Sequence, residues 1–239
     1  MAVILNIETS GPVCSVALTK DGVVEFQLDN ADGMRHAEML APFAEQCMEE
    51  LHRKGESLDA VAVSIGPGSY TGLRIGLSFA KGLAFSMGLP LIGVPTLKIL
   101  AVKAMFWNMD WTGDEILLPM LDARRMEVYA AAYDFALNAI DGPRPVVVDA
   151  DSWSDLLESH QVWLMGDGSE KLTEVITSPN AHFLPGLRPY AKDMTALSEK
   201  AFREGDFLDL AYSVPEYLKE YKAIVGSNRV LDEARRSRN

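Results

Sequence analysis

Apolar runs of strand length open the chain. Residues 2–7 form a continuous apolar run, and two further apolar segments, 13–19 and 23–28, flank the turn-forming pair Asp21 and Gly22. A continuous run is typical of a buried strand, and two segments about an Asp-Gly turn predict a hairpin. The chain therefore begins with three strands.

The segment after the hairpin has helical periodicity. Between residues 34 and 51, large apolar residues recur three or four positions apart, at Leu40, Phe43, Cys47 and Leu51. This spacing places them on one face of a helix. Pro42 is expected in or near the first turn of that helix, where its missing N–H does no harm.

The second half of the chain repeats the order of elements in the first half. The first half continues with strand 60–65, helix 71–87, strand 91–94 and helix 96–106, which gives β-β-β-α-β-α-β-α. The second half is predicted to hold strands at 116–121, 126–133, near 145–148, 162–165 and 181–184, and helices at 152–159, 169–176 and 195–203. We therefore expect two related α/β lobes, 1–107 and 108–215, with a cleft between them and a terminal segment at 216–239.

A glycine-rich turn joins the fourth strand to its helix. Gly66 and Gly68 can adopt positive φ and leave no Cβ in the way. Ser69 and Thr71 add hydroxyls beside the unpaired N–H groups of a helix N-terminus, a combination suited to an anion. The turn has neither the lysine of a GxxxxGK[ST] phosphate loop nor the spacing of GxGxxG. A second G-x-G-S turn, at 166–169, occupies the equivalent place in the second half.

The helix after this turn is apolar on nearly every side. Its small residues form two rows, Gly72, Gly76 and Ala80 in one and Ser78, Gly82 and Ser86 in the other. Because an interior Gly costs roughly 1 kcal/mol relative to Ala, these rows indicate close packing of backbones. Two interpretations stay open: a core helix between its own sheet and a neighbouring helix, or a helix-on-helix interface between subunits.

Charge and composition exclude several classes of protein. A formal net charge of −12 argues against a nucleic-acid-binding surface of the chain's own, since phosphate backbones are held by clustered Lys and Arg. The one basic cluster, formed by Arg229, Arg235, Arg236 and Arg238, is interpreted as a solvated tail. With only two cysteines, no basic leader and no apolar run of membrane-spanning length, the chain is expected in a reducing cytoplasm, with no membrane partner.

Six short motifs together resemble one known family. They are LNIETS at 5–10, CSVAL at 14–18, RHAE at 35–38, GPGSYTGLRIG at 66–76, KGLA at 81–84 and PEYL at 215–218. Over nearly its whole length the chain resembles the TsaB (YeaZ) family, the non-catalytic partner subunit in bacterial synthesis of N6-threonylcarbamoyladenosine on tRNA. The duplicated lobes likewise resemble the actin, sugar kinase and Hsp70 superfamily, with ribonuclease H-like mixed sheets, helices and an interlobe cleft.

The resemblance implies a function and partners. It implies a role in transferring threonylcarbamoyl to adenosine 37 of tRNAs that read ANN codons, with the catalytic paralogue TsaD as dimer partner and TsaE as accessory ATPase. The chain is expected to meet tRNA only through the complex and to form a homodimer when alone. The helices at 34–51 and 71–87 are expected to form the interface, with contacts from Leu40, Phe43, Cys47, Gly72, Gly76, Phe79, Ala80 and Leu83.

Catalytic residues and metal ligands are expected to be absent. The resemblance places Thr96 and Leu100 where TsaD carries a metal-binding HxxxH, and neither is a good ligand for a transition metal. Pro12 stands where the paralogue has Asp, and the side chains of Arg124 and Arg125 would fill the space of a triphosphate. No cofactor is expected beyond weak ATP or ADP binding at a vestigial anion turn made by Thr9, Ser10, Gly66, Gly68 and Ser69.

Two enzymatic alternatives stay open. An autonomous ATP-dependent phosphotransferase acting in the cleft needs an acidic base facing a glycine-rich phosphate turn in both lobes, and only the first lobe comes close. A peptidase needs a nucleophile with an oriented base or a metal pair. Ser10, Cys14 and Ser15 have no histidine nearby in the sequence.

Overall fold

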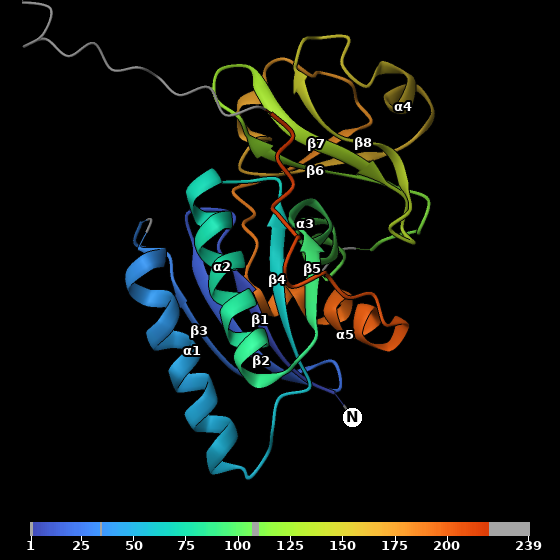
Figure 1. Cartoon of the computed structure of the whole chain (residues 1–239). Helices are drawn as coiled ribbons and strands as arrows, with labels where there is room; N and C mark the ends of the chain where they lie inside the picture. Colours follow the sequence, from blue (N-terminus) through green and yellow to red (C-terminus); the bar gives the residue numbers. More distant parts are fainter. Residues whose placement is uncertain (1, 34, 107–109, 220–239) are drawn as a thin grey trace, which may run out of the picture.

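Two five-stranded mixed sheets, one above the other, organise the protein in the computed structural model (Figure 1). The structure describes residues 2–33, 35–106 and 110–219. No helix in these ranges combines the length and apolar character needed to cross a membrane. The basic cluster of residues 229–238 lies outside the described residues, so its solvated state stays a prediction.

The first sheet has the predicted hairpin and crossover strands. Its members are β1 (Val3–Glu8), β2 (Cys14–Lys20), β3 (Val23–Asn30), β4 (Ala60–Gly66) and β5 (Leu91–Pro95), in the order β3-β2-β1-β4-β5. β1 pairs antiparallel with β2 and parallel with β4. Helices α1 (His36–Arg53) and α2 (Tyr70–Met87) lie side by side on one face, and α5 (Thr195–Glu204) lies on the other (Figure 1).

Helix α1 buries the predicted row of apolar side chains, and Pro42 lies in its interior. Leu40, Phe43, Cys47 and Leu51 are all buried against the first sheet. The first described helical residue is His36, so Pro42 lies in the helix interior and the first-turn prediction was wrong. Pro42 is exposed, and the hydrogen bond that it cannot donate is lost on the solvent-facing side of the helix. Residue 34, the expected start, lies outside the described residues.

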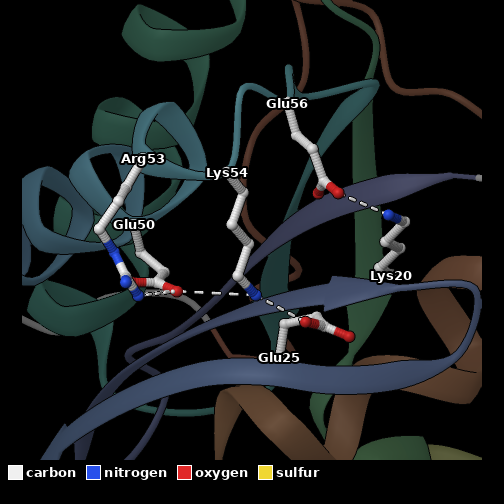
Figure 2. A network of polar contacts seen from close by, with 6 residues as sticks. All are labelled: Lys20, Glu25, Glu50, Arg53, Lys54 and Glu56. Carbon is white, nitrogen blue, oxygen red and sulfur yellow. Dashed lines mark hydrogen bonds and ion pairs between the residues drawn. The ribbon is translucent and has the colours of Figure 1, made fainter.

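Charged side chains join the C-terminal end of α1 to the β2–β3 hairpin (Figure 2). The Lys54 ammonium lies 2.7 Å from a carboxylate oxygen of Glu25 on β3, and Lys20 on β2 lies 2.6 Å from Glu56. Arg53 pairs with Glu50 on the solvent side of the same helical turn. Solvent-exposed ion pairs contribute little to stability. We therefore assign this network a role in orienting α1 on the sheet rather than in stabilising the fold.

Helix α3 (Thr96–Met105) is held between the two sheets. Leu97 and Leu100 pack into the core under the second sheet, whereas Ile99 packs with strands of the first. A helix covered on both sides has no polar face, which explains why its ten residues contain only two charges, Lys98 and Lys103. The interlobe junction is therefore a packed core around α3.

The second sheet repeats the arrangement of the first. It contains β6 (Ile116–Asp122), β7 (Glu127–Tyr133), β8 (Ala139–Val147), β9 (Val162–Gly166) and β10 (Ala181–Pro185) in the order β10-β9-β6-β7-β8, with α4 (Ser154–Ser159) in the β8–β9 connection. The two five-strand orders are equivalent, as the repeated pattern predicted. The helix predicted at 169–176 was wrong, because only the 3-10 turn η1 (Glu170–Leu172) forms there.

The last part of the chain returns to the first lobe. The 3-10 turn η2 (Ala191–Met194) and helix α5 pack against β1, β2 and β5, so part of the range 108–215 lies on the first sheet. Residues 206–219, which we call the C-terminal strap, then run along the first lobe and up to the second (Figure 1). Strap contacts include Leu208 N–H to the Leu91 carbonyl at 2.7 Å and an ion pair between Lys219 and Glu127. The domain boundaries at 107 and 215 stay predictions.

Candidate functional site: the glycine-rich turn and the α1–α2 surface

The glycine-rich turn of the first lobe is packed against the end of β1. The Ser69 N–H donates to the Ser10 carbonyl at 2.7 Å, and the Thr9 hydroxyl donates to the Gly72 carbonyl at 2.9 Å. A Cβ added at Gly68 would overlap the Ser10 carbonyl, and one added at Gly72 would overlap the Thr9 carbonyl. The close approach that the glycines permit is made by the chain itself.

The C-terminal strap closes the same turn from another side. The Glu216 N–H donates to the Ile65 carbonyl at 2.8 Å, and the Glu216 carbonyl lies 2.8 Å from the position of a Cβ on Gly66. Gly66 and Gly68 have φ of 118° and 158°, as the sequence predicted. Sequence periodicity gave no sign of this contact, because a single hydrogen bond joins residues 151 positions apart in the chain.

The five residues of the predicted anion turn therefore lie together. Thr9 and Ser10 are buried, and Ser69 caps α2 by accepting from the Gly72 N–H at 3.2 Å. The space in front of Gly66 and Gly68 is filled by main-chain atoms of Glu216 and Ser10. A nucleotide role for these residues stays a prediction, and it requires movement of the strap or of the β1–β2 turn.

Glu8 is a fully buried carboxylic acid at the end of β1. One carboxyl oxygen accepts from the Ser10 N–H at 2.5 Å, while the other has no partner among the described residues. Burial raises the pKa of Glu8 to about 7, against the lowering effect of the neighbouring polar groups of Ser10 and Ser64. The group is therefore partly protonated near neutral pH, which makes it a weak ligand for a cation.

His36 anchors the β1–β2 turn to the start of α1. Its Nε2 lies 3.0 Å from the Gly11 carbonyl, and the ring is buried. Burial lowers the pKa of His36, so the imidazole is neutral at pH 7. The residue that His36 contacts lies 25 positions earlier in the chain, so no local sequence pattern reports this contact.

The candidate nucleophiles Ser10, Cys14 and Ser15 are all buried. Burial raises the pKa of Cys14 to about 11, with a further contribution from the Glu8 charge, so its reactive thiolate is scarce. The Ser10 hydroxyl has no hydrogen-bond partner among the described residues, and Ser15 accepts from the Ala191 N–H at 3.1 Å. No three His, Cys, Asp or Glu side chains in the described ranges come together as a metal site. Thr96 and Leu100 are both fully buried in α3.

An open apolar groove runs between α1 and α2. It is lined by Ala41, Pro42, Ala44, Glu45, Met48, Phe79 and Leu83. Of the predicted interface residues, only Phe79 and Leu83 line this groove and are part-exposed. The other six are buried in the first-lobe core and unavailable to a partner: Leu40, Phe43, Cys47, Gly72, Gly76 and Ala80. The sequence predicted the two helices but not which side of each helix faces solvent.

These features define a duplicated α/β protein with two equivalent five-stranded mixed sheets, whose first-lobe turn is filled by its own chain. The family described as TsaD, tRNA N6-adenosine threonylcarbamoyltransferase, matches residues 32–227. Curated relatives named tRNA threonylcarbamoyladenosine biosynthesis protein TsaB are 30% identical in Escherichia coli K12, covering 90% of this chain and 94% of the relative, and 27% identical in Bacillus subtilis 168, covering 90% and 93%.

A solved structure gives the same result. YeaZ from Pseudomonas aeruginosa superposes with a TM-score of 0.76 at 27% identity, over 91% of this chain and all of the YeaZ chain. A second Pseudomonas aeruginosa structure, described as similar to peptidase YEAZ, has the same TM-score at 28% identity and covers 92% of this chain and all of that one. The chain belongs to the TsaB (YeaZ) family.

Proposed function

We propose that this chain is a non-catalytic subunit of the machinery that transfers threonylcarbamoyl to N6 of adenosine 37 in tRNAs that read ANN codons. Its relatives carry the name of threonylcarbamoyladenosine biosynthesis. The observation that carries the non-catalytic role is the filled turn: Ser10 and Glu216 occupy the space in front of Gly68 and Gly66. Ser10 and Cys14 support the same conclusion: the buried Ser10 hydroxyl has no hydrogen-bond partner among the described residues, and burial raises the pKa of Cys14.

The partner in this proposal is the catalytic paralogue TsaD, with TsaE as accessory ATPase. The α1–α2 groove is the proposed contact surface, because it exposes apolar side chains of Met48, Phe79 and Leu83 between two helices that lie side by side. Side chains of a second pair of helices can pack into such a groove and bury its apolar surface. Without the paralogue, a second copy of the chain takes its place and forms a homodimer.

Separate assays distinguish this role from the enzymatic alternatives. The purified chain alone is expected neither to hydrolyse ATP nor to cleave casein, and to co-purify with the paralogue when the two are expressed together. Release of phosphate or casein fragments by the chain alone, at a rate abolished by substitution of Ser10 or Cys14, would replace the scaffold role with an enzymatic one. Failure to co-purify with the paralogue would remove the proposed partner.

A further inference from the structure

Three arginines stand apart from every other cation in the described chain. Each described lysine, and each remaining arginine, makes an ion pair, a hydrogen bond or a contact with an aromatic ring. The guanidinium groups of Arg124, Arg125 and Arg188 make none of these with any described residue, and all three residues are exposed. In a chain with net charge −12, acidic side chains are abundant, so three unpaired guanidinium groups are unexpected.

The three arginines lie at one edge of the second sheet. Strand β6 runs parallel to β9, and β9 runs parallel to β10, so the carboxyl ends of these strands meet at the same edge. Arg124 and Arg125 follow β6, and Arg188 follows β10. Asp167, which follows β9, connects them: it accepts from the Asp122 N–H at 2.9 Å, and burial raises its pKa while the nearby charge of Arg188 counteracts that rise.

The turn that carries Arg124 and Arg125 is fixed in an unfavourable backbone conformation. Both residues have positive φ, 72° and 54°, which costs roughly 1 kcal/mol or more per residue for a side chain other than Gly. Lys171 holds the turn by donating to the Asp122 carboxylate and, at 2.7 Å each, to the carbonyls of Arg125 and Glu127. The Asp122 carboxylate is thus paired with Lys171, and neither guanidinium group pairs with a described carboxylate.

We infer that this edge, defined by Arg124, Arg125 and Arg188, contacts the phosphodiester backbone of an RNA. Adjacent strands lie about 4.8 Å apart, so the arginines extend over roughly 10 Å from β6 to β10, wider than one phosphate group. A row of phosphates matches such a row of guanidinium groups, which form paired hydrogen bonds with phosphate oxygens. The edge is exposed rather than enclosed, as a polymer requires.

The net charge of the chain limits what this edge can bind alone. Three arginines cannot hold an RNA alone on a protein of net charge −12, so the contact operates when the proposed paralogue complex binds tRNA. This inference therefore rests on the proposed function.

The test measures binding of fluorescently labelled tRNA to the complex of full chain and paralogue across a salt series. The variant R124G/R125G/R188Q removes three charges and keeps the fold, because Gly accepts positive φ without strain. The control R53Q/R144Q/R203Q removes three exposed charges elsewhere that are paired with carboxylates. We expect the variant, and not the control, to reduce the slope of log K against log salt by roughly 2 to 3.

Each outcome decides a different claim. An affinity and a salt slope equal to those of the control overturn the RNA contact while the complex stands. Loss of ATP binding by the variant with tRNA binding unchanged assigns the edge to a nucleotide and also overturns it. Failure of the wild-type chain to form the complex, seen by size-exclusion chromatography before tRNA is added, overturns the proposed function and the RNA contact together.

Discussion

Thr9 and Gly72 contact each other twice: the Thr9 hydroxyl donates to the Gly72 carbonyl at 2.9 Å, and the Thr9 carbonyl fills the position that a Cβ would take on Gly72. The first row of small residues on α2 is therefore explained by packing within the chain. Gly76 belongs to the same contact, since a Cβ there would overlap the Thr9 hydroxyl. Of the two interpretations that the sequence left open, the core helix describes this row.

Substitution of Gly72 tests this explanation. Gly72→Ala is expected to lower the free energy of unfolding by about 1 to 3 kcal/mol, because neither the helix nor the Thr9 main chain can move aside cheaply. Gly82→Ala is the matched control on the same helix, where a Cβ meets no atom within 4 Å and should raise stability by about 1 kcal/mol. Urea unfolding measures both, and equal effects at the two positions would contradict the packing account.

The exposed side of α2 gives the test of the partner surface. Leu83→Arg places a charge in the apolar α1–α2 groove and is expected to weaken both homodimerisation and paralogue binding by at least about 30-fold, roughly 2 kcal/mol. Because Leu83 is part-exposed, the fold should survive, whereas Gly76→Arg would disrupt the core.

Phe85→Arg is the control for this experiment. Phe85 is 78% exposed on the same helix and lies outside the groove. Analytical ultracentrifugation of the three proteins should show weaker association for Leu83→Arg alone. If Phe85→Arg dissociates the dimer and Leu83→Arg does not, the partner surface lies on the opposite side of α2.

Glu8 predicts how stability depends on pH. The pKa of Glu8 is about 7 in the folded protein, whereas its ordinary value, which applies to the unfolded chain, is 4.5. Between pH 4.5 and 7 the folded state therefore binds a proton that the unfolded state does not. Stability should fall as pH rises from 4.5 to 7 and level off above, a loss of roughly 3 kcal/mol from this group. Glu8→Gln keeps the acceptor for Ser10 and should remove the loss.

Comparison of wild type with Glu8→Gln separates the effect of Glu8 on stability from that of His36. The pKa of His36 is lowered, so its effect on stability has the opposite sign. The difference in unfolding free energy between Glu8→Gln and wild type, measured by urea at several pH values, should grow from pH 5 to pH 7. Parallel pH profiles would show that Glu8 ionises normally.

The sequence predicted the elements whose signals are local. The Asp21-Gly22 hairpin, the buried row on α1 and the positive φ of Gly66 and Gly68 are confirmed, because each follows from a turn residue or a periodicity. The helix expected at 169–176 fails for a local reason as well: Thr173, Val175 and Ile176 are β-branched and poor helix formers.

Contacts between distant segments account for what the sequence could not predict. The anchoring of the β1–β2 turn to the start of α1 depends on the contact of His36 with Gly11, and the closure of the glycine-rich turn depends on the strap residue Glu216. Neither contact has a periodic or compositional signal. The candidate anion residues were found from their types, while the atoms that fill their space came from the C-terminal strap.

The central claim is that the chain supports threonylcarbamoyl transfer without catalysing it. The most direct measurement supplies threonylcarbamoyl-adenylate, tRNA and ATP to this chain alone, to the paralogue alone, and to the pair with the accessory ATPase, and counts modified adenosine 37. We expect product only when the chain accompanies the paralogue, and little product with Leu83→Arg. Transfer by the chain alone, or undiminished transfer by the paralogue without it, would contradict the account.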